Sequence, residues 1–349
     1  GLVGSEMCIR DSFYVGSGET AMRRVNLNTS TTITASGSGA LIFRNLINGS
    51  SGVKTLTLRG YSSSLNTVSS KLSDVGGALT INKEDGGTWL LSGSNTYTGG
   101  TNITEGFLAT TESSVGPGAG VFGSGAVRLS NGGLLALHPS GLTVNNPVQL
   151  SNNTTNAFAG TAINLVGSGA TPIDWPSGNS PLRLMNTTRN GVTFSGAISS
   201  VNSADRDFEL YGPGSYIFNT PMVSVTGAGL IRTRLNTTGR VTFNRSAVTN
   251  TRGIDMDQGT VLINAPHPFT APGQTDGVLE IAGGNLQSAD SAFTTGGNAL
   301  QMSLVLSDRY GVIDGTHSIE FVGQSSRNNS FESNSYLNNK NFQMLTNNL

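Results

Sequence analysis

The sequence has few charged residues. Lys, Arg, Asp and Glu make up 12% of the 349 residues, against about 25% in an average soluble domain. The formal net charge is -1 at pH 7, and the basic residues are scattered along the chain rather than clustered. Nucleic acids and anionic membranes attract proteins with a basic surface, so the composition argues against both as partners.

Cysteine is nearly absent, which excludes a disulfide framework. The single cysteine, Cys8, lies in an opening segment, residues 1–12, that differs in texture from the rest and resembles a translated sequencing-adapter fragment of a metagenomic reading frame. We therefore expect residues 1–12 to be non-native and set them apart from the fold. The remaining Cys-free chain suits a protein that crosses an oxidising periplasm unfolded. Because the chain has no initiator Met and stops in mid-pattern at Leu349, we expect its natural ends to lie outside it.

Long apolar runs and helical periodicity are also missing. No run of about 18 apolar residues predicts a membrane-spanning helix, and no window carries a long apolar stripe of period 3.6. The chain is rich instead in Gly, with 47 residues, and in short runs where apolar and polar side chains alternate, the period of a half-buried strand. Such runs occur at 40–43, 54–58, 78–81, 126–129, 133–137, 142–144, 192–194, 241–243 and 278–281.

The most informative segment is 77–108. Two short alternating strands, 89–91 and 102–104, are joined by a turn of Asn95, Gly99 and Gly100, and a Gly-x-Leu step then begins another strand. The residues that carry the pattern are Gly77, Leu79, Trp89, Leu91, Ser92, Gly93, Asn95, Thr96, Tyr97, Thr98, Gly99, Gly100, Thr101, Gly106 and Leu108. Lys83 stands between the alternating run 78–81 and the strand 89–91.

These residues resemble the autotransporter-associated β-strand repeat, or passenger-associated transport repeat, of bacterial secreted and surface proteins. The resemblance implies export through an outer-membrane β-barrel translocator, which is outside this chain, and an extracellular or cell-surface location. Weaker copies of the unit follow. The Gly-x-Leu step returns at Gly133, Gly259 and Gly284, and the segment 208–218 places Tyr216 where the repeat has Trp89.

We predict an all-β fold, a right-handed parallel β-helix in which residues 13–349 form one continuous single-stranded solenoid. One coil cannot bury its inward side chains alone, but stacked coils pair every strand with the next and enclose a column of Leu, Ile, Val and Phe. Gly and Asn suit the corners, where positive φ is needed. A β-sandwich is the main structural alternative, but its hairpins need regular short turns that this chain lacks.

Two acidic clusters are the candidate chemistry. Asp255 and Asp257 stand at i and i+2, so we expect both carboxylates on one outer strand face, where such pairs hold calcium or perform acid/base catalysis in β-helical polysaccharide enzymes. Only Arg252 is a nearby cation in the sequence, and a solvated strand face is the favoured interpretation. Asp205 and Asp207 have the same spacing, with Arg206 between them as a neutralising charge in an expected charged loop.

Other site signals are weak. His138, His267 and His317 are isolated, and no zinc, nucleotide-binding, serine-hydrolase or calcium-repeat motif occurs, so we expect no metal and no cofactor. Asn-x-Ser/Thr triplets arise from composition alone. Trp89, Tyr97 and Phe107 could form an aromatic platform for sugars, although packing in the core is the favoured interpretation.

Three functional hypotheses remain open. The leading one is a non-catalytic extracellular stalk or passenger with no catalytic residue. The second is an adhesin that binds glycans or matrix along its polar flank. The third is a polysaccharide-active enzyme that uses Asp255 and Asp257, which would need a groove with converging carboxylates and a cation.

Overall fold

The structure is a computed structural model. It describes residues 7–8, 11–116, 120–169, 172–201, 205–220, 224–226, 231–244, 251–264, 277–288, 302–306, 311–315 and 342–346. This described part consists of strands and turns without a helix, and accordingly it holds no apolar helix of membrane-spanning length. The chain divides into two compact units, Gly1–Ile173 and Asp174–Leu349.

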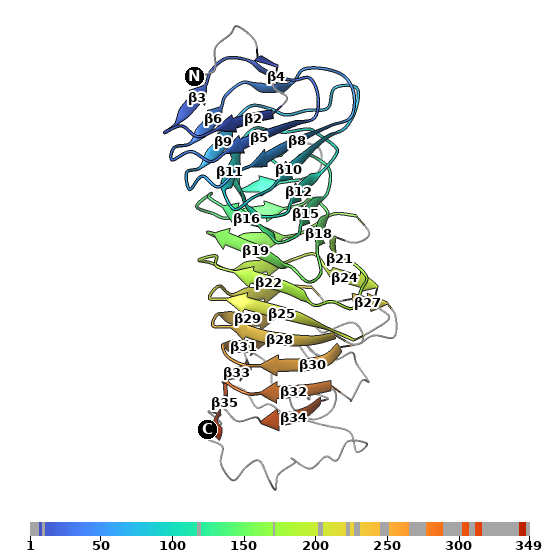
Figure 1. Cartoon of the computed structure of the whole chain (residues 1–349). Helices are drawn as coiled ribbons and strands as arrows, with labels where there is room; N and C mark the ends of the chain where they lie inside the picture. The colour runs from blue at the N-terminus through green and yellow to red at the C-terminus, as the bar shows by residue number, and fades with distance from the viewer. Residues whose placement is uncertain are drawn as a thin grey trace. The chain divides into compact units, whose positions relative to one another are not determined.

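Unit 1 is built from parallel sheets whose successive strands come from successive coils (Figure 1). The β2 sheet runs in the order β2 (Asp11–Tyr14), β5 (Thr31–Ala35), β8 (Lys54–Arg59), β10 (Leu79–Lys83), β12 (Thr101–Ile103), β15 (Val127–Leu129) and β18 (Val148–Leu150). The β3 sheet runs in the order β3 (Glu19–Ala21), β6 (Leu41–Phe43), β9 (Asn66–Val68), β11 (Thr88–Leu91), β13 (Gly106–Thr110), β16 (Gly132–Ala136) and β19 (Thr155–Gly160).

A third side of unit 1 is closed by shorter strands. These are β1 (Met7–Cys8), β4 (Val25–Leu27) and β7 (Leu46–Asn48) in one sheet, and β14 (Ser114–Val115), β17 (Leu142–Val144) and β20 (Ile163–Leu165) in another. Strand β21 (Ile173–Trp175) spans the boundary between the units. Residues 7–8 and 11–12 thus lie in strands, while the non-native origin of residues 1–12 stays a prediction.

Unit 2 repeats this arrangement. The β22 sheet consists of β22 (Leu182–Asn186), β25 (Arg206–Gly212), β28 (Ile231–Thr237), β30 (Thr251–Met256), β32 (Gly277–Ile281) and β34 (Met302–Leu306). The β23 sheet consists of β23 (Val192–Phe194), β26 (Tyr216–Phe218), β29 (Arg240–Phe243), β31 (Thr260–Ile263), β33 (Gly284–Ser288), β35 (Gly311–Gly315) and β36 (Phe342–Thr346). Strands β24 (Ile198–Val201) and β27 (Ser224–Thr226) pair on a further side.

The core is a set of columns of like residues. In the β23 sheet, Phe194, Phe218 and Phe243 are register partners, and each is at most 1% exposed. Their rings stack at centroid distances of 4.9 and 5.3 Å with interplanar angles of 10° and 9°. Such pairs add about 0.5–1.5 kcal/mol each beyond the burial of their area, so the column stabilises the stacking of coils as well as each coil.

The predicted parallel β-solenoid is confirmed. The pairings between described strands are parallel and join coils, whereas a β-sandwich would need antiparallel hairpins. The structure divides the chain into two compact units. The prediction that residues 13–349 form one continuous domain stays a prediction.

One repeat step was placed a residue too far along the chain. The register pairs Gly106 with Gly132 and Leu108 with Leu134, so the step is Gly132-x-Leu134 and not Gly133-Leu134-Leu135. A shift of one residue moves every side chain to the other face of a strand. Leu134 is accordingly fully buried, while Leu135 is partly exposed.

Candidate functional site

The repeat residues form the interior of one coil in unit 1. Trp89 on β11 and Tyr97 in the following turn are both 0% exposed. The Trp89 Nε1 donates to the carbonyl oxygen of Arg59 at 3.2 Å. The Tyr97 hydroxyl lies 2.6 Å from Thr101 Oγ1, and burial raises the pKa of Tyr97 well above its ordinary value. Since Trp89 and Tyr97 are enclosed, a surface aromatic platform with Phe107 is ruled out.

Asn95 joins its coil to two others. It is 1% exposed, and its Oδ1 accepts from Leu72 N at 2.7 Å while its Nδ2 donates to Val121 O at 2.7 Å. A buried amide that is satisfied on both sides fixes its neighbours strongly, because any change would leave a buried polar group unpaired. The motif Asn therefore acts as a clamp between coils.

Lys83 is a second clamp, at the corner between β10 and β11. Its side chain is fully buried, and its Nζ donates to the carbonyl oxygens of Glu84 at 2.7 Å, Asp85 at 2.5 Å and Glu105 at 3.0 Å. Burial lowers the pKa of Lys83 to about 8, against the opposing influence of nearby carboxylates. Asp85 itself adopts a positive φ of 57°, so the ammonium holds together a corner that the backbone alone would not favour.

The other motif residues complete this packing. Leu79, Leu91 and Leu108 are fully buried. Gly106 has a positive φ of 64°, and a Cβ there would lie 2.5 Å from Asp85 O, so only glycine fits. The remaining motif residues, which lie between strands β9 and β13, are Gly77, Ser92, Gly93, Thr96, Thr98, Gly99 and Gly100. The pattern thus encodes a coil and its contacts with neighbouring coils.

A similar joint occurs in unit 2. Tyr216 is 0% exposed, and its hydroxyl oxygen lies within hydrogen-bond distance of two carbonyl oxygens, Leu184 O at 2.9 Å and Tyr211 O at 2.8 Å. Trp89 and Tyr216 therefore both tie a buried ring to the backbone of an earlier coil, as the weaker resemblance of 208–218 to the repeat predicts.

The predicted acid pair lies at the end of β30. Asp255 is within the strand and Asp257 directly follows it. Burial, followed by the charges of Glu280 and Asp257, raises the pKa of Asp255, while Arg232 and Arg234 act in the opposite direction. Asp255 Oδ2 lies 3.9 Å from Arg232 Nη1. The sequence-based view of Arg252 as the one nearby cation is therefore wrong, because the neighbouring coil supplies Arg232 and Arg234.

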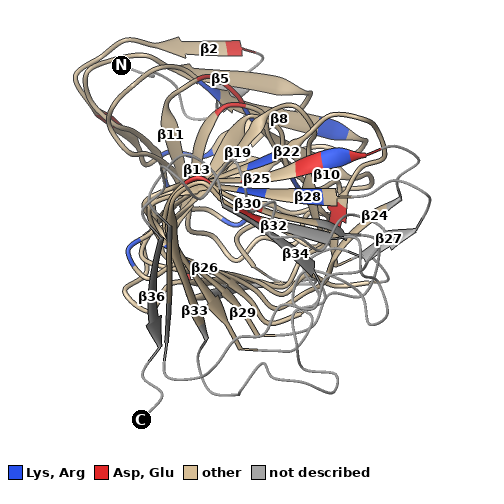
Figure 2. Ribbon diagram, turned by 90° about the horizontal axis from the view of Figure 1, so that it is seen from below, with Lys and Arg blue, Asp and Glu red and all other residues tan. Residues whose placement is uncertain are grey.

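Charged side chains form a register column across the β22 sheet. Arg183, Glu209, Arg234, Asp255 and Glu280 are successive partners on β22, β25, β28, β30 and β32, and Figure 2 shows basic and acidic segments together on these strands. Arg183 Nε lies 2.7 Å from Glu209 Oε2. The charges alternate until Asp255 meets Glu280, where two like charges are neighbours.

The Asp205 cluster differs from its prediction. Asp205 is exposed before the start of β25, and Asp207 Oδ2 lies 3.1 Å from Arg234 Nε on β28. Arg206 points to the other face, is 5% exposed, and sits with its Cζ 4.0 Å from the ring centroid of Trp175. Arg206 therefore does not neutralise its sequence neighbours. Arg206 is in phase with the buried residues Phe208 and Leu210 along β25, and this phase predicts that its side chain points inward.

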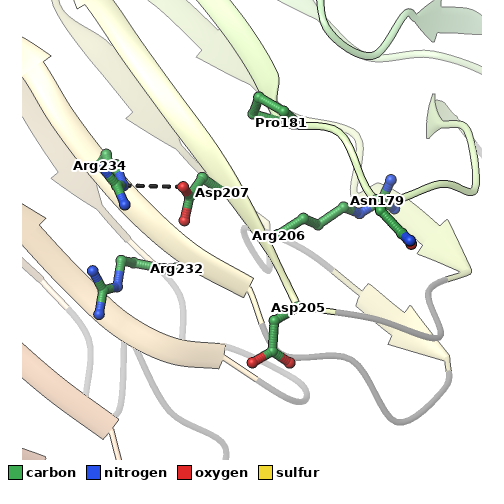
Figure 3. A pocket seen from close by; sticks show the side chains of 7 residues that line it. All are labelled: Asn179, Pro181, Asp205, Arg206, Asp207, Arg232 and Arg234. Atoms are coloured by element: carbon green, nitrogen blue, oxygen red, sulfur yellow. Dashed lines mark ion pairs between the residues drawn. The ribbon is translucent and has the colours of Figure 1, made fainter.

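A cavity of about 270 Å³ opens beside these residues (Figure 3). It is lined by Asn179, Pro181, Asp205, Arg206, Asp207, Arg232 and Arg234. In Figure 3, Arg206 extends from the start of β25 toward Asn179, and Arg234 is joined to Asp207. Burial lowers the pKa of Arg206 to about 10, which still leaves it charged at neutral pH. Asp255 and Asp257 are not part of the lining.

In the described residues, histidine and the other metal-ligating side chains do not come together in a metal-binding cluster. His138 Nδ1 accepts from Ser140 N at 3.1 Å in a turn after β16, and His267 and His317 lie outside the described part of the chain. Within that part, no group of three or more His, Cys, Asp or Glu side chains could hold a metal ion.

Comparison with known proteins identifies the repeat. Residues 81–109 match the family described as Passenger-associated-transport-repeat, so the resemblance predicted from 77–108 is confirmed. Over 113 residues the chain is 36% identical to a protein named Adhesin BmaC autotransporter, from Brucella suis biovar 1 (strain 1330). That match covers 31% of this chain and 3% of the length of the relative. No solved structure gives a significant match.

Proposed function

We propose that this chain, a parallel β-solenoid with a passenger-associated transport repeat, is a non-catalytic segment of the extracellular passenger of a bacterial autotransporter-like surface protein. In this proposal the solenoid is a stalk that projects or displays a surface. Its partner in export is an outer-membrane β-barrel translocator outside this chain, and it acts in the extracellular space or on the cell surface.

The burial and hydrogen bonding of the repeat residues support the proposal. Trp89, Asn95 and Lys83 are buried and bonded to neighbouring coils, so the repeat serves the extension of a scaffold. A solenoid whose coils contact their neighbours can fold progressively from one end, which suits a chain that emerges from a translocator as an unfolded strand.

A surface-display assay tests this proposal. A fusion protein is expressed in a Gram-negative laboratory host. In it, residues 13–349 replace the passenger of an autotransporter that displays its own passenger efficiently, and the signal peptide and translocator of that autotransporter are kept. We expect an antibody against the insert to label intact cells, and external protease to remove the label. The matched control lacks the translocator and should label only after the cells are opened. Retention of the full fusion inside the cell, with the translocator correctly inserted, would contradict the proposal.

A second role, adhesion, is compatible with the scaffold. The similar protein is named an adhesin, and the β22 sheet presents a charged cavity on its flank. We propose that the passenger also binds glycans through that flank. Beads coated with residues 13–349 should retain glycans from an array, whereas no retention above that of uncoated beads would leave only the stalk role.

The enzyme hypothesis has its own test. Depolymerisation of a polysaccharide by the chain, abolished by Asp257→Asn, would support catalysis by Asp255 and Asp257. Because neither carboxylate lines the cavity beside Arg206, we do not assign them a catalytic role.

A further inference from the structure

We propose that the cavity of unit 2 lined by Arg206 and Arg232 is a binding site for the carboxylate of an acidic sugar, such as a uronic acid. This inference deepens the adhesive part of the proposed function. Its test uses the isolated chain, so it can fail or succeed independently of export.

The first argument is the state of Arg206. This guanidinium is 5% exposed and stacks on Trp175. It donates to Pro176 O at 2.9 Å and to Ser200 Oγ, but among the described residues its buried Nε has no acceptor and no carboxylate pairs with it. A buried cation without a counter-charge is costly, and a ligand carboxylate in the cavity would supply that charge.

The second argument is the position of Arg232. Its register partner on β25 is Asp207, but Asp207 reaches diagonally to Arg234 instead, at 3.1 Å. Its partner on β30 is Gly253, which has no side chain. Within the described residues, the nearest carboxylate to Arg232 is then Asp255 at 3.9 Å, beyond hydrogen-bond distance. Arg232 is thus a partly exposed guanidinium with its donors available.

The third argument is the chemistry of the remaining lining. Arg is suited to planar, bidentate binding of carboxylates, while Asp205 and the amide of Asn179 can accept or donate hydrogen bonds to hydroxyls. A ligand with one carboxylate and several hydroxyls matches both parts. The volume of about 270 Å³ is just below the range of about 300–1,000 Å³ for drug-sized ligands, which indicates a single sugar residue.

A ligand-detected NMR titration of the full chain tests the site. The probes are glucuronate, glucose and acetate, which separate the acidic sugar from a neutral sugar and from a bare carboxylate. We expect glucuronate to bind with a dissociation constant on the order of 1 mM, the affinity expected for a ligand of this size, and glucose and acetate to bind at least tenfold more weakly. Equal binding of acetate would overturn the sugar assignment, and no binding of glucuronate at about 10 mM would overturn the site.

Two variants locate the binding. Arg232→Gln should weaken glucuronate binding at least tenfold, because it removes a charge-assisted donor that has no short partner in the free protein. The matched control is Arg240→Gln, which removes an exposed cation of the β23 sheet away from the cavity, and should bind as the unmodified chain does. Circular dichroism verifies that both variants keep their strands. Equal binding by Arg232→Gln and Arg240→Gln would overturn the proposal.

Discussion

The replacement Lys83→Met tests whether the repeat lysine clamps the corner of its coil. The methionine keeps the length and the apolar stem of the side chain but leaves the carbonyl groups of Glu84, Asp85 and Glu105 without their donor. Hydrogen bonds to a charged group contribute about 1.5–3 kcal/mol each, so the loss is about 4.5–9 kcal/mol before the cost of burying the ammonium is subtracted.

That cost follows from the pKa of Lys83. Burial lowers it from 10.5 to about 8, and each pKa unit corresponds to about 1.4 kcal/mol, so the buried charge costs about 3.4 kcal/mol at neutral pH. The difference leaves about 1–6 kcal/mol in favour of Lys83. We therefore expect Lys83→Met to lower the free energy of unfolding of unit 1 by about 3 kcal/mol at pH 7.

The effect should grow with pH. Below pH 8 both folded and unfolded states keep the proton on Lys83, and the penalty is constant. Between pH 8 and 10.5 the folded state releases the proton while the unfolded state still binds it, so the stability that depends on Lys83 rises with pH. The gap between the unmodified chain and Lys83→Met should widen by about 1.5–2 kcal/mol between pH 7 and pH 9.5, since other titrating groups cancel in the comparison.

The chain supplies a local reporter for this measurement. It has two tryptophans, Trp89 in the same coil as Lys83 and Trp175 in unit 2. In a Trp175→Phe background, urea unfolding followed by fluorescence reports unit 1 alone, which matters because stacked repeats need not unfold in one step. Lys71→Met, at an exposed position, is the control. Equal stability of Lys83→Met and Lys71→Met would refute the clamp, and a gap that narrows with rising pH would refute the lowered pKa of Lys83.

Three further predictions concern the core and the corners. Phe218→Ala should lower the free energy of unfolding of unit 2 by at least about 3–5 kcal/mol, because it removes two stacked ring pairs. Urea unfolding followed by the fluorescence of the tryptophan of unit 2 measures this loss. A loss below about 1 kcal/mol would contradict the stabilising role of the phenylalanine column. Gly60→Ala and Gly52→Ala share φ values of 112° and 109°, but a Cβ would lie 2.0 Å from Ala35 O only at Gly60. We expect about 1–2 kcal/mol for Gly52 and a larger loss for Gly60, and equal melting temperatures would argue against this close approach. Asn95→Asp keeps the shape but removes the donor to a carbonyl oxygen, so it should cost more than about 2 kcal/mol at pH 7, and unchanged hydrogen exchange in the adjoining coils would speak against the amide bridge.

The sequence was most informative where side chains are large and turns are constrained. Trp89, Tyr97 and Asn95 predict a coil because each is costly to bury without a partner, and the structure supplies those partners. Register was harder to predict. At Gly132 and Gly133 two glycines stand side by side, and nothing local tells which one opens the strand.

The charged surface depends on contacts between coils, which the sequence does not display. Arg232 and Asp255 are far apart along the chain, and the coils between register partners differ in length, so their approach to 3.9 Å could not be predicted by counting residues. The burial of Arg206 was predictable in principle from its phase with Phe208. Its charge favoured a surface position, and the stacking on Trp175 that makes burial tolerable is visible only in three dimensions.

Distances between spin labels in unit 1 test the parallel stacking of coils most directly. Thr32, Thr57, Asn82, Asn102, Arg128 and Gln149 are successive register partners, and each step adds about 4.8 Å. In a Cys8→Ser background, label pairs at Thr32 and Gln149 and at Thr57 and Gln149 should give mean distances of about 24 and 19 Å by pulsed electron resonance. Equal distances for the two pairs, or a longer distance from Thr57 than from Thr32, would contradict the solenoid.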